Sequence, residues 1–259
     1  MRSTGTQAIA MRLLRIALVT CSLIAAGCLP KSAPTGPLPA GGKHVLFIGN
    51  SLTYVHDLPR TVEQLAELTG DTIRAAMLAK PDYALLDHLA DGLVQEILER
   101  ERWDVVVMQQ GSSALAEGRS WLYQGVDRLA PLIRAAGGRP ALYEVWPTIN
   151  RTFDVPGVRT SYLTAAHRVD GLFFPAGTAW QEAFKRDGSL ALYDADGLHP
   201  SRVGTFLAAL VIVEQLTGKD VRALPAVAYA DGVPLTLGAP TISLLQEAAH
   251  AANLRGMTP

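Results

Sequence analysis

The sequence predicts an α/β fold in which five parallel strands form one sheet with helices on both faces. Short apolar runs, rich in β-branched residues, alternate five times with segments of helical periodicity, and this alternation is typical of parallel sheets. The chain has 259 residues, of which 49% are hydrophobic and 18% charged, so it can bury a substantial core. Together these observations predict a three-layer α/β/α domain without internal repeats.

The first strand and the first helix lie near the start of this pattern. Residues 45–48 are apolar without a helical period and stop at Gly49, which predicts a buried parallel strand. Apolar residues then recur at helical spacing over 57–69, and Gly70 is a typical helix stop. The domain is therefore expected to open with a strand, a tight loop and a helix.

Four further strand and helix units follow in the same order. The predicted strands are short apolar runs that stop at glycine, proline or polar residues, and they cover 72–78, 103–108, 141–146 and 172–174. The predicted helices carry apolar stripes, and they cover 81–100, 121–136, 162–169 and 179–185.

The last part of the chain adds helices without a further strand. A loop over 187–198 leads to the apolar segment 201–216, which predicts a buried helix. Residues 221–240 are less regular. The segment 241–254 predicts a terminal helix that packs through its apolar residues.

The first 27 residues predict a secretory signal. Three arginines precede an apolar run at 16–27, which is too short to span a bilayer comfortably and ends in small residues. Residues 25–28, Ala-Ala-Gly-Cys, resemble a bacterial lipobox, in which the signal is cut before a cysteine that carries lipid. We therefore expect export to the bacterial cell envelope and a lipid on Cys28. Ordinary cleavage near Ala26 and an uncleaved anchor are the alternatives.

The domain boundaries follow from this leader. Residues 28–42 are rich in proline, glycine and alanine and are expected to act as a tether, and 43–259 form the folded domain with its C-terminal helix. Both cysteines, Cys21 and Cys28, lie in the export segment. The folded domain is therefore expected to hold neither a disulfide nor a cysteine-based metal site.

Charge and missing motifs exclude several function classes. The formal net charge is −1 and no basic cluster is interleaved with aromatic residues, so a nucleic-acid surface is not indicated. The chain has no G-x-S-x-G, H-E-x-x-H or C-x-x-C motif, and no G-x-G-x-x-G opens a helix. We expect no metal or cofactor, and small neutral or weakly charged substrates remain open.

Ser51 follows the end of the first predicted strand. Ligands bind beyond the carboxyl ends of the strands in open α/β sheets, so a hydroxyl placed there can meet a substrate. The alternative is that the Asn50-Ser51 turn only caps the helix that follows. Whether Ser51 is a nucleophile depends on a base elsewhere in the chain.

A candidate base lies near the other end of the chain, in the segment Asp196-Gly-Leu-His199-Pro200. Histidine is the usual base for a serine hydroxyl, and it needs a carboxylate that fixes its tautomer. Two intervening residues let one turn of chain present Asp196 and His199 together, and Pro200 is expected at the first helical position. The alternative is that both side chains merely cap the helix over 201–216.

The two motifs in this order resemble those of the SGNH hydrolases, the GDSL-like lipase and esterase superfamily, over about 45–216. This resemblance implies a flavodoxin-like parallel sheet and the hydrolysis of esters. Ser51 would be the nucleophile, His199 the general base and then acid, and Asp196 its orienting carboxylate. Asp194 is an alternative carboxylate, two places off the motif.

The oxyanion hole departs from the family pattern in two places. The family supplies the serine N–H, a glycine after the second strand and an asparagine after the third. Here Ala79 and Lys80 stand where the glycine is expected, and Gln109-Gln110-Gly111 follows the third strand. Ser51 and one of the two glutamines, Gln109 or Gln110, are therefore expected to bind the oxyanion. The alternative is that both glutamines only end a strand.

Other histidines and Trp146 carry weaker signals. His56 is close to Ser51 but is expected to be a loop or first-turn residue, and His88 is expected in a helix, exposed or bonded to a partner. Trp146 ends the fourth predicted strand at the edge where Ser51 lies. It could line an acyl or sugar pocket, or belong to the core.

These patterns predict an exported, lipid-anchored serine esterase that hydrolyses small-molecule or glycan esters, with carbohydrate O-acetyl esters as a candidate substrate class. Two other functions stay open. The same triad could serve an O-acyltransferase, or the chain could be a catalytically silent surface lipoprotein that binds glycan. Contact with a membrane is expected only through the N-terminal lipid.

Overall fold

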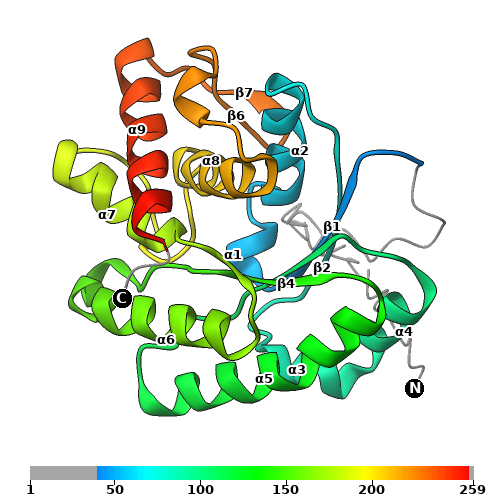
Figure 1. Ribbon diagram of the computed structural model, residues 1–259. Helices are drawn as coiled ribbons and strands as arrows, with labels where there is room; N and C mark the ends of the chain where they lie inside the picture. The colour runs from blue at the N-terminus through cyan, green and yellow to red at the C-terminus, as the bar shows by residue number, and fades with distance from the viewer. Residues whose placement is uncertain (1–39, 257–259) are drawn as a thin grey trace, which may run out of the picture.

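The computed structural model describes residues 40–256. The predicted signal at 1–27, the lipidation site Cys28 and most of the tether lie outside the described residues. The described part forms the predicted parallel sheet between two helical layers (Figure 1). None of the helices within residues 40–256 combines the length and the apolar character that a membrane crossing requires.

The sheet has one central reversal of strand order. Its strands are β1 (Lys43–Gly49), β2 (Ile73–Ala79), β3 (Val105–Met108), β4 (Arg139–Tyr143) and β5 (Leu172–Phe174). They lie in the order β2-β1-β3-β4-β5, and every neighbouring pair is parallel. The order reverses between β1 and β3, and the carboxyl ends of such a pair form the usual ligand crevice of open α/β sheets.

Two groups of helices cover the sheet (Figure 1). One layer contains α3 (Leu85–Asp91), α4 (Leu93–Arg100), α5 (Ala116–Ala135) and α6 (Val155–Arg168). The other contains α2 (Leu58–Leu68), α7 (Ala176–Arg186), α8 (Arg202–Thr217) and α9 (Ala239–Arg255). The smaller elements are α1 (Ser51–Tyr54), the 3-10 helices η1 (Ile149–Asp154) and η2 (Val221–Ala223), and the hairpin of β6 (Tyr229–Ala230) and β7 (Val233–Pro234).

The sequences of β1 and α8 are continuous apolar runs because both elements lie in the core. The four residues 45–48 of β1 are buried because helices cover both faces of the sheet. Residues 204–213 of α8 are buried all round the helix, since α8 packs against α2, α7 and α9. These two elements carry the segments on which the candidate site is built.

The predicted helix over 81–100 is in fact two helices. Gly92 separates α3 from α4 with a φ of 84°, a left-handed conformation that glycine adopts without a steric penalty. Both helices pack against α5, so their apolar stripes continue across the break. Periodicity alone therefore indicated a single helix.

Other boundaries differ by a few residues. β4 ends at Tyr143, earlier than the predicted 146, whereas α5 and α6 begin at Ala116 and Val155, ahead of the predicted 121 and 162. The first turn of α5 carries no buried apolar residue, so no stripe marked its start. The first turn of α6 contains a proline, which is tolerated there because its missing N–H would have no partner.

Candidate active site

Ser51 lies directly beyond the carboxyl end of β1, where the strand order reverses. β1 ends at Gly49, and Asn50 caps α1 by accepting the N–H of Leu52 at 3.1 Å. Ser51 is the first residue of α1 and is half-buried. The capping role that the sequence left open at this turn thus belongs to the Asn50 side chain.

Gln109, which follows β3, holds this turn in place. Its amide oxygen accepts the Asn50 N–H at 2.9 Å and the Thr53 hydroxyl at 2.8 Å. Its amide nitrogen donates to the Asn50 side chain at 2.9 Å and to the Gln110 carbonyl at 2.6 Å. Gln109 is 1% exposed, so water does not compete for these bonds. A Cβ at Gly49 would lie 2.3 Å from the Gln109 amide oxygen, which explains the glycine.

A buried histidine supports the same turn from α3. His88 Nε2 lies 2.8 Å from the Gly49 carbonyl oxygen, which also accepts the Lys80 N–H at 3.2 Å. Burial lowers the pKa of His88, so the neutral ring donates through Nε2. The backbone N–H of Lys80, near the position of the expected family glycine, is therefore already bonded.

The segment 193–201 forms a compact loop ahead of α8. Tyr193 and Pro200 pair in an isolated antiparallel bridge, and the Ser201 hydroxyl accepts two N–H groups of the first turn of α8. The predicted helix start at Pro200 was wrong, because Ser201 is the N-cap and Arg202 is the first helical residue. The alternative, in which Asp196 and His199 cap this helix, does not occur, because the Ser201 side chain is the cap.

Two contacts support this loop from behind. The Ile149 N–H donates to the Gly197 carbonyl at 2.8 Å, and Trp146 Nε1 donates to the Leu198 carbonyl at 3.1 Å. Trp146 is 2% exposed and stacks on Trp180 with ring centres 3.5 Å apart. Trp146 therefore belongs to the core beneath the loop.

Asp196 and His199 face each other within the loop. His199 Nδ1 lies 2.5 Å from Asp196 Oδ2, and Asp196 Oδ1 accepts the N–H groups of Leu198 and His199 at 2.9 Å each. The bond with the His199 ring, followed by the two N–H bonds, lowers the pKa of Asp196 to about 2. With Nδ1 engaged by the carboxylate, Nε2 is the nitrogen that can accept a proton. This is the arrangement of a base and its orienting carboxylate.

A cleft of about 310 Å³ is lined by residues from both predicted motifs, although neither Asp196 nor His199 is among them. Ser51 lines it from β1 and α1, and Leu198, which lies between Asp196 and His199, lines it from the loop. Within residues 40–256 the Ser51 hydroxyl makes no hydrogen bond, so it is not bonded to His199 in this structure. Such catalytic bonds are often long in ligand-free enzymes and tighten when substrate binds.

The two glutamines lie differently with respect to the cleft. Gln110 lines it, whereas Gln109 does not. Gln110 Nε2 donates to the Ser113 hydroxyl at 2.9 Å and to the Gly118 carbonyl at 3.0 Å. Both amide nitrogens thus have two acceptors, and only Gln110 could turn a donor into the cleft by releasing one of them.

The walls of the cleft are aromatic and carry little charge. Tyr83 and Trp121 line it, and Trp121 is 46% exposed. Asp82 is the one charged residue among those that line it. The cleft therefore suits a neutral substrate that can lie against aromatic rings.

Asp194, the alternative carboxylate, contacts a different histidine. Its Oδ2 lies 3.1 Å from His56 Nε2, whereas the bond to His199 is made by Asp196. His56 follows α1, in the loop position expected from the sequence.

Comparison with solved structures relates the fold of this chain to known proteins. No protein-family model and no curated protein matches the chain. A DUF4886 family protein from Bacteroides uniformis is 21% identical, with a TM-score of 0.70 over 82% of this chain and 95% of that one. A Slackia heliotrinireducens protein assigned to the SGNH hydrolases is 29% identical, with a TM-score of 0.56 over 68% of this chain and 100% of that one. The chain belongs to the SGNH hydrolase superfamily.

Other solved structures share the fold at lower identity. A catalytic mutant of an acetylxylan esterase from Geobacillus stearothermophilus is 18% identical, with a TM-score of 0.53 over 69% of this chain and 96% of that one. This likeness concerns the fold. It agrees with the predicted arrangement of a parallel sheet between two helical layers.

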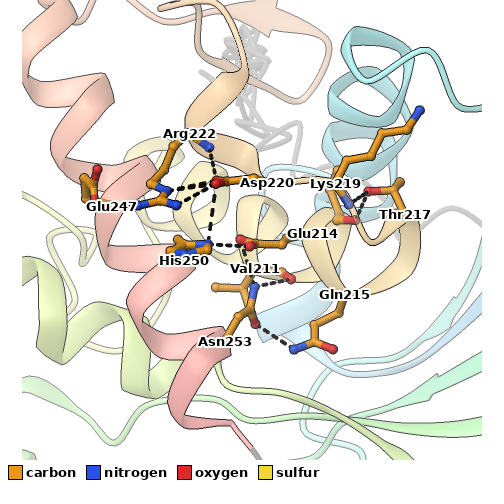
Figure 2. Close-up of polar contacts among 11 residues, drawn as sticks. Val211, Glu214, Gln215, Thr217, Lys219, Asp220, Arg222, Glu247, His250 and Asn253 are labelled. Atoms are coloured by element: carbon orange, nitrogen blue, oxygen red, sulfur yellow. Dashed lines mark hydrogen bonds and ion pairs between the residues drawn. The ribbon is translucent and has the colours of Figure 1, made fainter.

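This SGNH superfamily member also has a titratable cluster between α8 and α9, formed by Glu214, Asp220 and His250 (Figure 2). It is the one group in residues 40–256 whose ligand atoms lie close enough to share a metal ion. His250 Nδ1 lies 2.6 Å from Glu214 and 3.6 Å from Asp220, while Arg222 binds Asp220 and Asn253 donates to Glu214. These donors already occupy the carboxylates, so the cluster serves to link α8 to α9 through hydrogen bonds. None of its residues lines the cleft.

Sequence reasoning missed the residues that hold the turn after β1. Gln109 was one of two candidates for binding the oxyanion, and neither its bonds to Asn50 nor the contact of His88 with the Gly49 carbonyl was expected. Both act through hydrogen bonds that depend on the spatial order of β1, β2 and β3. The available signal was that Gln109 follows β3 and Ser51 follows β1. This placement indicated that the two residues lie close together, but it did not indicate the bonds between Gln109 and Asn50.

Proposed function

We propose that the protein is an exported serine esterase in which Ser51 is the nucleophile, His199 the general base and Asp196 its orienting carboxylate. The observation that carries this proposal is the Asp196–His199 pair on a loop that shares a cleft with Ser51. The fold shared with a protein described as an SGNH hydrolase supports a hydrolase.

The proposed reaction has two steps. Ser51 Oγ bonds to the acyl carbon while its proton passes to His199 Nε2, and the ester C–O bond breaks as this proton passes to the departing alcohol. Water then attacks the acyl-enzyme, with His199 as base again, and releases the carboxylic acid and free Ser51. No step requires a metal or cofactor.

The oxyanion is proposed to bind to the Ser51 N–H and the Gln110 amide. Asn50 and Gln109 fix the backbone that carries the first donor. Gln110 is chosen over Gln109 because it lines the cleft. It would exchange its bond to Ser113 or Gly118 for one to the oxyanion. Removing one such donor typically costs about 3 kcal/mol of transition-state stabilisation.

Carbohydrate O-acetyl esters are the proposed substrate class. Tyr83 and Trp121 give the cleft two aromatic faces for a sugar ring, and no lysine or arginine lines it. The fold neighbours described as acetylxylan esterases support the same class. A lipid on Cys28 would hold the enzyme at the cell envelope, outside the cytoplasm. Glycan esters would be accessible to it there.

The test compares the full-length protein with Ser51→Ala and with the control Ser112→Ala, which changes a second serine of the same cleft. We expect hydrolysis of p-nitrophenyl acetate by the wild type, a loss of at least about 10³-fold in Ser51→Ala, and retention of activity in the control. Hydrolysis that survives Ser51→Ala would contradict the proposal. So would acyl transfer to a glycan hydroxyl in place of water, or glycan binding without hydrolysis.

A further inference from the structure

His56 and Asp194 join the two segments that carry the proposed catalytic groups. His56 Nε2 lies 3.1 Å from Asp194 Oδ2, although the two residues are 138 positions apart. His56 lies in the loop between α1 and α2, close behind Ser51, and Asp194 begins the turn that leads to His199. The contact therefore spans the nucleophile segment and the base loop.

The Asp194 backbone is hydrogen-bonded to that of His199, the proposed base. Its N–H donates to the His199 carbonyl at 2.9 Å, and its carbonyl accepts the Gly197 N–H at 3.0 Å. Asp194 therefore closes the turn that presents Asp196 and His199. Any shift of Asp194 would move the His199 backbone with it.

On the other side, His56 is held close to the nucleophile. The Val55 N–H donates to the Ser51 carbonyl at 3.0 Å, and the Asp57 N–H donates to the Tyr54 carbonyl at 3.0 Å. His56 and Asp57 have φ values of 56° and 42°, so two successive non-glycine residues are left-handed. Such residues cost free energy and are kept where the surrounding structure needs them. Here they turn the chain between α1 and α2, where Asp57 caps α2 and His56 contacts Asp194.

We propose that His56 and Asp194 are positioning residues that set the distance between Ser51 and His199. This inference rests on the proposed esterase function. Neither residue lines the cleft and neither belongs to the proposed triad, so their expected effect is on the position of the catalytic groups alone. They act by holding the segment of the nucleophile and the loop of the base at one separation.

The partial exposure of His56 and Asp194 indicates that their contact positions the catalytic groups more than it stabilises the fold. The His56 and Asp194 side chains are 21% and 43% exposed, and polar contacts that solvent reaches contribute little to global stability. A small displacement of a catalytic group, in contrast, can cost about 10²-fold in rate. Loss of the contact is therefore expected to lower kcat much more than it lowers the melting temperature.

The experiment is a double-mutant cycle on the full-length protein with His56→Ala, Asp194→Ala and the double variant. We expect each single variant to lower kcat for p-nitrophenyl acetate about tenfold with KM within about twofold. The double variant should be no slower than the singles, because the two side chains act through one contact. His56→Gln, which keeps a donor near Asp194, should recover part of kcat.

The matched control is the other histidine–carboxylate pair, His250 and Glu214 (Figure 2). His250→Ala removes a 2.6 Å contact between α8 and α9. We expect it to lower the melting temperature without changing kcat, since the pair lies outside the cleft. The same melting scans identify any variant of His56 or Asp194 that fails to fold.

The outcomes separate this inference from the proposed function. If the wild type hydrolyses esters through Ser51 but folded His56 and Asp194 variants keep wild-type kcat, the positioning role is wrong and the esterase stands. Multiplicative losses in the double variant would also overturn the shared contact. If the wild type neither hydrolyses esters nor reacts with a fluorophosphonate at Ser51, both proposals fail together.

Discussion

Gln109 and Asn50 hold each other through two hydrogen bonds that join the loop after β3 to the turn after β1. The Asn50 N–H donates to Gln109 Oε1 and Gln109 Nε2 donates to Asn50 Oδ1, each at a distance of 2.9 Å. Ser51 follows Asn50 directly, so this reciprocal pair fixes the backbone of the proposed nucleophile. The side chain that resembled an oxyanion donor thus has a positioning role.

Gln109→Ala is expected to impair both stability and activity. It leaves the buried Asn50 N–H without its acceptor, which costs about 1–3 kcal/mol, and it frees the turn that carries Ser51. Thermal unfolding and steady-state kinetics should show a lower melting temperature and a kcat reduced more than KM is changed.

Gln95→Ala provides the control for this change. Gln95 Nε2 donates to the Leu89 carbonyl at 2.9 Å, away from the cleft. It should alter stability alone. A Gln109→Ala protein with the wild-type kcat would show that the turn keeps its shape without the amide.

Asp196→Asn is expected to lower kcat by about 10³- to 10⁴-fold, because an amide does not hold the His199 ring in the required tautomer. The pKa of Asp196 is lowered to about 2 by its bond to His199 and by two N–H groups, so the carboxylate stays ionised above pH 4. Its contribution to stability is present above its ordinary pKa and is lost as the pH falls towards 2. Kinetics from pH 5 to 9 should therefore show no loss from protonation of Asp196, and retained kcat in Asp196→Asn would contradict its role.

Glu144→Gln is expected to change how stability depends on pH. Glu144 is fully buried just beyond β4, and burial raises its pKa from 4.5 to about 7 although bonds from Thr178 lower it. The folded protein therefore keeps this proton while the unfolded chain loses it, so stability falls as the pH rises from 4.5 to 7.

The neutral glutamine removes this loss. Denaturant unfolding should be measured at pH 4.5 and pH 8. Between these values the unfolding free energy of the variant, relative to that of the wild type, should rise by at most about 3 kcal/mol, since one pKa unit corresponds to about 1.4 kcal/mol. An equal difference in unfolding free energy at both pH values would rule out a raised pKa for Glu144.

Trp121→Ala tests the proposed sugar subsite. An aromatic contact beyond simple burial contributes about 0.5–1.5 kcal/mol, so KM for an acetylated xylo-oligosaccharide should rise about two- to twelvefold with kcat unchanged. Leu115→Ala is the control, because Leu115 is 63% exposed and does not line the cleft. An unchanged KM in Trp121→Ala would remove this side chain from substrate binding.

The sequence was sufficient for the sheet and for the pairing of Asp196 with His199. Buried parallel strands such as β1 and β3 are apolar on both faces, and a D-x-x-H spacing lets one turn present both side chains. The family motifs also favoured Asp196 over Asp194, and the hydrogen bonds agree.

The rest depended on contacts that no local pattern specifies. Gly92 splits a helix whose apolar stripe is continuous, because both parts pack on the same neighbour. The roles of Gln109 and His88 depend on the strand order, and the contact of His56 with Asp194 joins residues far apart in sequence. Long-range hydrogen bonds between loops leave no periodic signal in the chain.

The most direct test of the central claim is labelling by a fluorophosphonate probe followed by mass mapping of the labelled peptide. An activated serine displaces fluoride and forms a stable phosphonyl adduct, whereas an ordinary surface serine does not react. We predict one adduct, on Ser51, that is lost in Ser51→Ala and strongly slowed in His199→Ala. An unlabelled wild-type protein, or an adduct on another serine such as Ser112, would contradict the assignment of Ser51 as the nucleophile.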